Sequence, residues 1–256
     1  MKYFLQETKA LTWRWFLQLK KEPFSILFAL IQPVIWLALF GNVFSKASSI
    51  PGFPSGNYIT FMCAGVIVMT VLGNGISGGI PLLLDKESGY LEKILVTPIN
   101  RSSIIVSRFV FVVLISCIQS LIILGFSMIL GARINSGIYG VIFILIISSA
   151  FGIGFTIISL ALSFLLNSHA EFFAVNTFLT LPLFFASTAL MPQNLLPYWL
   201  QVVSTFNPLT YAIDSIRSLI IQGFDLNLVL KSLAILLIFD LLCLVVTVRI
   251  FSRKIG

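Results

Sequence analysis

Six long runs of apolar residues, separated by short polar segments, divide the chain from one end to the other. Apolar side chains within each run fall on every face of a helix, which favours helices over the alternating strands of a barrel. Each run has the roughly 20 residues needed to cross a hydrocarbon core about 30 Å thick. We therefore predict an all-α integral membrane protein with six transmembrane helices, at Phe24–Phe44, Tyr58–Leu84, Ile104–Leu130, Ile138–Leu166, Phe172–Leu190 and Leu228–Ile250.

The composition leaves little room for anything outside the membrane. Of the 256 residues, 58% are hydrophobic and 10% are charged, whereas soluble domains carry about 25% charged residues. Residues 1–256 are therefore predicted to form a single membrane domain. The cysteines lie inside apolar runs and His169 is the lone histidine, so we predict no metal site and no disulfide framework.

The distribution of basic residues predicts the orientation, because Lys and Arg near span ends are retained on the cytoplasmic side. With the N-terminus inside, 12 of the 16 basic residues fall in inner segments; the outer ones are Lys46, Arg133, Arg217 and Lys231. Both termini and the polar segment Asp85–Arg101 are thus predicted to be cytoplasmic, or stromal in a plastid. The net charge of +7 then needs no nucleic acid to explain it.

Residues 3–21 have the pattern of an amphipathic helix lying in the membrane interface. Phe4, Leu11, Trp15, Phe16 and Leu19 share one face, and Gln6, Lys9 and Lys20 lie roughly opposite. Trp prefers the headgroup zone, and the residue before Pro23 is disfavoured in a helix. We predict an interfacial helix that ends before Pro23.

Two alternative functions each have one supporting feature. Asp240 lies deep in the sixth run, and a buried carboxyl there is expected on the pathway of an ion-coupled secondary transporter. Its other interpretation is an interhelical hydrogen bond. Gly75–Gly78 has the GxSG form of intramembrane serine proteases, with Ser77 as nucleophile and His169 as base. Ser77 lies within the second run and His169 in a turn after the fourth, so close approach is not expected, and small residues here also suit close helix packing.

The energy source is the next question. No GxxxxGK[ST] phosphate-binding loop occurs in the sequence, so a function driven by ATP requires a second protein that binds the nucleotide. The segment Asp85–Arg101, DKESGYLEKILVTPINR, lies between two predicted spans on the predicted inner side. It is the largest candidate for docking such a partner.

Two motifs in the chain resemble one family. The string from Glu87 to Arg101 resembles the E-x-G-x-x-E…T-P-x-x-R element of ABC-2 type permeases, the membrane subunits of a class of ABC exporters. The segment from Pro192 to Arg217 is similar to the P-x-x-x-L-P-x-W and N-P-L-T-Y-x-x-x-x-x-R pattern that these permeases carry before the last span. The chain looks most like drug-resistance-type permeases of cyanobacteria and their plastid-encoded relatives.

The resemblance implies a non-enzymatic permease subunit of a plastid (chloroplast) or bacterial inner membrane that exports a lipophilic or amphipathic substrate. It implies a homodimer or heterodimer of permeases in membrane lipid, and a separate ABC ATPase that binds ATP and Mg²⁺, so this chain needs no cofactor of its own. Residues 85–101 would form the coupling-helix loop, with docking residues Glu87, Gly89, Tyr90, Leu91, Glu92, Lys93, Leu95, Thr97, Pro98 and Arg101. Residues 192–227 would form an outer re-entrant segment with Pro192, Pro197, Trp199, Asn207, Pro208, Tyr211 and Arg217.

Overall fold

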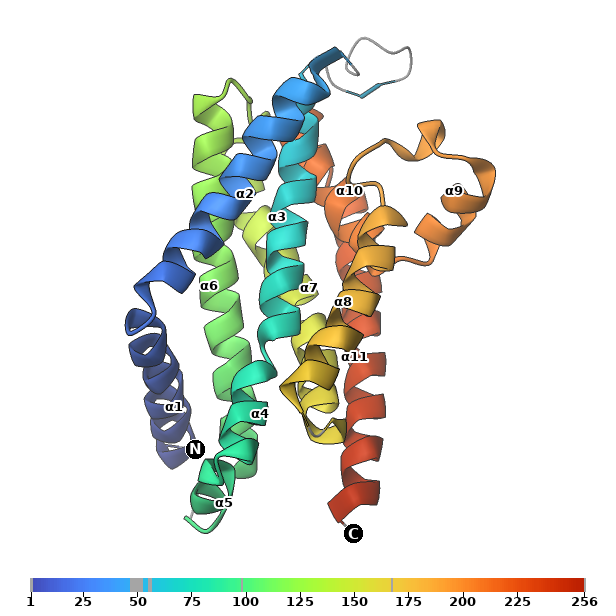
Figure 1. Ribbon diagram of the computed structural model, residues 1–256. Helices are drawn as coiled ribbons and strands as arrows, with labels where there is room; N and C mark the ends of the chain where they lie inside the picture. Colours follow the sequence, from blue (N-terminus) through green and yellow to red (C-terminus); the bar gives the residue numbers. More distant parts are fainter. Residues whose placement is uncertain (1, 47–52, 55–56, 98, 167, 256) are drawn as a thin grey trace.

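The protein is a bundle of long helices with short helices at its two ends (Figure 1). The computed structural model describes residues 2–46, 53–54, 57–97, 99–166 and 168–255, and every regular element among them is a helix. The elements are α1 (Lys2–Lys20), α2 (Pro23–Val43), α3 (Tyr58–Ser77), α4 (Ile80–Glu87), α5 (Tyr90–Leu95), α6 (Arg101–Ile129), α7 (Gly137–Leu165), α8 (His169–Phe185), the 3₁₀ turn η2 (Gln193–Leu195), α9 (Tyr198–Thr205), α10 (Pro208–Ile221) and α11 (Leu226–Ile255).

The helices follow the predicted apolar runs, and the chain is an all-helical membrane protein. Four described stretches are long and apolar enough to cross a bilayer: Tyr58–Glu87, Ser102–Ile129, Gly137–Leu165 and Leu226–Arg249. Leu27–Val43 is apolar but shorter, and α8 has 17 residues. The six-span count therefore remains a prediction at α2 and α8.

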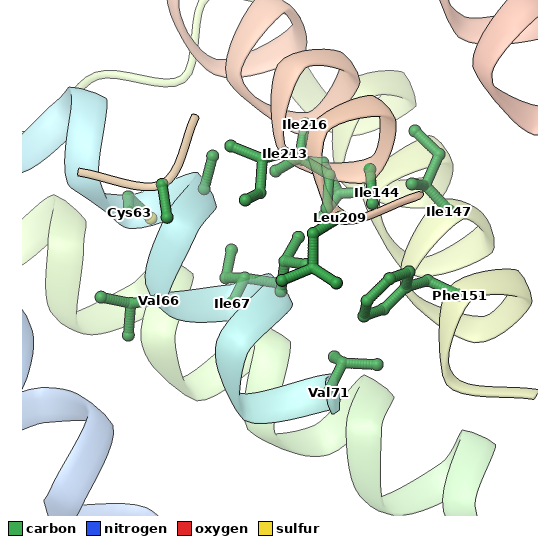
Figure 2. Packing of buried hydrophobic residues seen from close by; sticks show 14 of the residues in the cluster. Cys63, Val66, Ile67, Val71, Ile144, Ile147, Phe151, Leu209, Ile213 and Ile216 are labelled. Carbon is green, nitrogen blue, oxygen red and sulfur yellow. The ribbon is translucent and has the colours of Figure 1, made fainter. Parts of the chain in front are cut away.

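Helix α3 is the centre of the bundle. In its most apolar window 72% of the residues are buried, whereas only 17% are buried in the corresponding window of α11. Figure 2 shows the core, a buried cluster to which α3 contributes Ile67, α7 contributes Phe151 and α10 contributes Ile213. Because apolar side chains on α11 need not be shielded from lipid, a lightly buried α11 is expected of a helix at the lipid boundary.

The two ends of the bundle carry different elements (Figure 1). The start of α1, the turn between α4 and α5 and the end of α11 lie together at one end, which we call the α5 end. The α6–α7 connection, α9 and the end of α10 lie toward the opposite end, which we call the α9 end. The sequence predicts a shared side for both termini and residues 85–101, and their common end is consistent with it.

Helix α1 runs along α6, with the predicted apolar face turned toward it. Phe16 packs edge-on against Phe111 of α6 with ring centroids 5.1 Å apart. Glu7 accepts a hydrogen bond of 2.7 Å from the hydroxyl of Ser103. Trp15 is buried, so α1 is held by specific tertiary contacts as well as by its amphipathic pattern. Its placement at the membrane interface stays a prediction.

The segment between α8 and α11 is folded back onto the bundle through α10. Helix α8 ends at Phe185, five residues before the predicted end of the fifth run at Leu190. The side-chain amide of Asn207 donates to the carbonyls of Leu183 (2.7 Å) and Ala186 (3.0 Å). These two bonds satisfy carbonyl groups at the end of α8, which explains why the helix ends inside an apolar run.

Candidate functional site

The turn between α4 and α5 is set by Gly89. Its backbone has φ +68° and ψ 8°, the left-handed conformation in which a residue with a Cβ is strained. No atom lies within 4 Å of the position that a Cβ would occupy. Glycine is therefore needed here for its backbone freedom, since no neighbour crowds it, and it directs α5 away from the axis of α4.

Helix α5 has one buried face and one exposed face. Leu91 and Ile94 are buried, and Leu91 packs in a cluster with Leu82 of α4 and Leu160 of α7. The exposed residues are Tyr90, Glu92 and Lys93. The residues that α5 presents outward are therefore polar or aromatic, while Leu91 anchors α5 to its own bundle.

The other predicted docking residues lie around this helix. Thr97 is exposed, and its hydroxyl donates to the carbonyl of Ile94 (2.5 Å) just beyond the end of α5. Leu95 is the last residue of α5 and Arg101 the first residue of α6. Pro98 lies outside the described residues. The motif residues thus surround one short helix and the turn that follows it.

Glu87, the first residue of the docking motif, contacts a residue of another helix. One of its carboxylate oxygens, Oε2, lies 2.9 Å from Nε2 of His169, which begins α8. The pair is an ion pair when the imidazole is protonated. Lys86 also donates to the carbonyl of Leu166, just before α8 (3.2 Å). The end of α4 is therefore linked to the start of α8.

A second polar cluster links α4 to α1. Arg14 of α1 makes two hydrogen bonds to Asp85, of 2.7 and 3.2 Å. Its guanidinium carbon lies 4.3 Å from the ring centroid of Tyr90 and 4.5 Å from that of Trp15. Arg108 of α6 also lies over the Trp15 ring, with its guanidinium carbon 3.2 Å from the ring centroid. Stacked cations and aromatic rings at this end connect α1, α4, α5 and α6.

Sequence reasoning did not identify Arg14, Asp85 or Arg108 as partners. Arg14 and Asp85 are 71 residues apart along the chain, and Arg108 contacts Trp15 of another helix, so no local spacing indicates these contacts. The available signal is that Arg108 lies at the end of an apolar run, where an unpaired charge is costly. Its Nη2 atom has no hydrogen-bond partner among the described residues.

At the junction between α3 and α4 the backbone lies close against α7. A Cβ on Gly79 would lie 2.3 Å from the carbonyl oxygen of Ser159. The Ser159 hydroxyl accepts a hydrogen bond from the backbone N–H of Gly79 (2.8 Å) and donates to the carbonyl of Ile76. One hydroxyl thus satisfies two backbone groups at the helix break, as membrane helices require.

Near the α9 end, Arg217 is the centre of a buried network. Its guanidinium donates to Asp214 (3.0 Å) and to the carbonyls of Thr188 (2.7 Å) and Phe61 (3.4 Å). The guanidinium carbon also lies 3.7 Å from the centroid of the Phe61 ring. Burial lowers the pKa of Arg217 to about 10, and Asp214 opposes this shift, so Arg217 keeps its charge at neutral pH.

The remaining residues of the second motif have different positions. Asn207 precedes α10, and its side chain accepts a hydrogen bond from the backbone N–H of Leu209. Pro208 begins α10, and the Tyr211 hydroxyl donates to the carbonyl of Thr205 (2.7 Å). Trp199 is exposed on α9. Pro192 and Pro197 directly precede η2 and α9. The motif therefore supplies caps and bends around a buried arginine.

A cavity of about 390 Å³ lies beside α3. It is bordered by α2, α3 and α8, with one residue from α6, and Figure 1 shows α3 between α2 and α8. Its lining is mostly apolar. The residues that line it are Ala29, Gln32, Pro33, Trp36, Met62, Gly65, Val66, Met69, Thr70, Gly73, Asn74, Ser77, Gln119, Thr180 and Phe184.

The residues that suggest a serine protease (Ser77 and His169) or an ion-coupled transporter (Asp240) lie in different parts of the structure. His169 contacts Glu87, and Ser77 is an exposed residue of the cavity lining. Asp240 is buried on α11, and its Oδ1 has no hydrogen-bond partner among the described residues. No group of three or more His, Cys, Asp or Glu suited to a metal ion occurs in the part of the chain that the structure describes.

Comparison with known proteins identifies the family to which these elements belong. The model of the ABC-2 type transporter family matches residues 6–221. The chain belongs to the ABC-2 type transporter family. The matched residues include the turn between α4 and α5, the helices around the cavity and the Arg217 network. The match identifies the chain as a transmembrane subunit of an ABC transporter. Membership favours this function over the secondary transporter and the protease.

Relatives of this ABC-2 permease come from plastids and bacteria. The transport permease ycf38 of Cyanophora paradoxa is 38% identical over 256 residues, which cover 93% of this chain and 87% of that protein. The ycf38 permease of Porphyra purpurea is 39% identical over an alignment that covers 83% of this chain and 73% of that protein. DrrC of Mycobacterium tuberculosis, named as a doxorubicin resistance ABC transporter permease, is 23% identical. The alignment covers 86% of this chain and 77% of that protein. These relatives are consistent with a multi-pass protein of a plastid or bacterial membrane.

Proposed function

We propose that this permease forms half of the membrane domain of an exporter and takes mechanical work from a separately encoded ABC ATPase. ATP and Mg²⁺ bind to that ATPase, because this sequence has no phosphate-binding loop of its own. The chain crosses the membrane six times and pairs with a second copy or a close relative. Its termini and the α5 end lie on the cytoplasmic or stromal side, as the 12 basic residues there indicate.

The ATPase docks on the exposed face of α5. The observation that carries this proposal is the division of α5 into a buried and an exposed face. Leu91 and Ile94 pack into the bundle, while Tyr90, Glu92 and Lys93 lie at the surface. A helix anchored in this way transmits a push on its outer face, because its inner face cannot slide without disrupting packed side chains.

Two routes carry the movement of α5 into the membrane. One passes through α4 to the close crossing of Gly79 with Ser159 and so into α3. The other passes from Glu87 to His169 and so into α8. Because α3 and α8 both border the cavity, movement at α5 changes the shape of the cavity from two sides.

The membrane surfaces have assigned roles in this proposal. Helix α1 (Lys2–Lys20), which contains most of the predicted interfacial segment 3–21, lies in the cytoplasmic interface with Trp13 exposed. Residues 192–227 form a re-entrant segment at the outer leaflet, where exposed Tyr198 and Trp199 on α9 suit the headgroup region. The substrate is lipophilic or amphipathic and passes the mostly apolar cavity.

Co-purification with the ATPase tests the docking surface. Reversing both charges on α5, Glu92→Lys with Lys93→Glu, places the wrong charges on the exposed face and is expected to remove most of the bound ATPase. Arg133→Glu is the matched control, because Arg133 is exposed in the α6–α7 connection at the other end of the bundle. Full ATPase binding by the double variant contradicts the proposal.

A further inference from the structure

The cavity beside α3 has a mostly apolar lining with a few uncharged polar side chains, which limits what it binds. Of the described residues that line it, none is ionisable. An ammonium or phosphate group placed there would meet no opposite charge, and burying an unpaired charge is strongly unfavourable. A ligand of this cavity therefore has a neutral buried part.

Most of the hydrogen-bond donors in the lining are already used. The Thr70 hydroxyl donates to the carbonyl of Val66 (2.8 Å), and the Thr180 hydroxyl donates to that of Asn176 (2.8 Å). The side-chain amide of Asn74 donates to Gln119 Oε1 (2.6 Å) and to the hydroxyl of Ser116 (3.1 Å). These groups retain free lone pairs rather than free hydrogens.

Asn74 is held so that its acceptor remains available. Both of its amide hydrogens are engaged, and no described residue donates to its Oδ1 atom. Gln119 is fixed in turn, because its amide donates to the carbonyl of Ala29 on α2 (3.3 Å). An amide that is fixed by its donors and lines an apolar cavity is suited to accept a hydrogen bond from a ligand.

We propose that this cavity binds an uncharged, hydroxyl-bearing lipophile, with the hydroxyl donating to Asn74 Oδ1 and the apolar part against Trp36 and Phe184. A hydroxyl fits best because it donates to Asn74 or Thr70 and also accepts from the unbonded groups of Gln32 or Ser77. This inference rests on the proposed export function and specifies its substrate class.

Binding to the isolated permease in lipid nanodiscs tests the proposal without the ATPase. The probe is a monoacylglycerol with a dibrominated acyl chain, which quenches the fluorescence of Trp36 in the lining; Trp36→Phe defines the background. Its di-O-methyl ether keeps the acceptors and lacks the hydroxyl donors. We expect the hydroxylated probe to quench at a mole fraction about 3- to 10-fold lower than the ether, the worth of one hydrogen bond.

Two variants locate the effect. Asn74→Leu and the nearly isosteric Thr70→Val are each expected to reduce the preference for the hydroxylated probe. Thr247→Val is the control, because Thr247 makes the same hydroxyl-to-carbonyl bond on α11 (2.7 Å) outside the cavity. Equal quenching by the two probes, an unchanged preference in Asn74→Leu, or tighter binding of a brominated alkyl phosphate or alkylammonium overturns the proposal.

The two proposals fail in different ways. A cavity variant that no longer prefers the hydroxylated probe should still co-purify with the ATPase, because the cavity residues lie away from α5. Loss of ATPase docking leaves probe binding unchanged, since binding is measured without the ATPase.

Discussion

The two ends of the bundle use polar side chains in different ways. Toward the α9 end, Arg217 has a side chain only 8% exposed and bonds to two backbone carbonyls and to Asp214. At the α5 end, the Glu87–His169 pair has side chains 35% and 31% exposed. The first arrangement fixes one geometry, whereas the second joins two flexible side chains that water can reach.

This difference indicates which of the two polar links is easier to break. A buried, hydrogen-bonded charge is strongly destabilising to disrupt, about 3–5 kcal/mol, because a partner is left uncompensated. A half-exposed ion pair contributes about 0–1 kcal/mol. Contacts of the second kind can break and form again during a transport cycle. We infer that the Arg217 network anchors the α9 end, whereas the Glu87–His169 link between α4 and α8 can break and form again. The buried Asp85 and Arg108 hold α1 against the α5 end.

The largest effect on stability is expected from Arg217→Met. The variant leaves the carbonyls of Thr188 and Phe61 without their donor and Asp214 without its charge partner. We expect a loss of about 3 kcal/mol in the free energy of unfolding, measured by denaturant titration in detergent micelles. A loss below about 1 kcal/mol would mean that this network is no anchor.

Gly79→Ala is expected to have the next largest effect. The added Cβ would lie 2.3 Å from the carbonyl oxygen of Ser159, so α3 and α7 must separate, at about 1–3 kcal/mol. Gly73→Ala, in the preceding helix α3, is the control, because nothing lies within 4 Å of its Cβ position. Thermal unfolding of both variants checks the contrast, and equal melting temperatures would refute the close crossing.

His169→Gln is expected to change coupling and hardly change stability. The variant removes the imidazole that faces Glu87 and leaves every predicted docking residue in place; the stability change should be below about 1 kcal/mol. The readout is thiol labelling of a Ser77→Cys reporter in the cavity, in a chain whose native cysteines are replaced by alanine. The change in labelling rate on adding ATP and Mg²⁺ to the complex should shrink several-fold. An undiminished change would exclude the α8 route.

Asp240→Asn should have the smallest effect. If ATP hydrolysis drives transport, a neutral side chain of the same shape at Asp240 leaves ATP-dependent export unchanged. Export measured in proteoliposomes with and without a proton gradient checks this. Dependence on the gradient that Asp240→Asn abolishes would revive the ion-coupled alternative.

Sequence alone predicted the helices well because the apolar runs are long and the spans need no partner to be recognised. Two motifs likewise identified the family, and the comparisons confirmed it. The ends of elements were harder: α8 stops at Phe185 because Asn207, far along the chain, caps its carbonyls. The break between α3 and α4 similarly depends on Ser159 of α7.

Side-chain partnerships were beyond a single sequence. The predicted docking set includes Leu91 beside Tyr90 and Glu92, whereas the fold buries Leu91 against Leu82 of α4 and Leu160 of α7. Ile94 is buried as well. Asn74 and Gln119 offered a signal that went unused, since an amide inside an apolar run is costly unless it is paired or functional. Their pairing across α3 and α6 requires the three-dimensional arrangement.

Photo-crosslinking most directly tests whether the α5 end docks the ATPase. A photoreactive amino acid at Lys93 should form a crosslink to the ATPase that increases on adding ATP, while the same amino acid at Arg133 should form none. Crosslinking from position 133 instead of 93 would contradict both the docking surface and the orientation of the protein in the membrane.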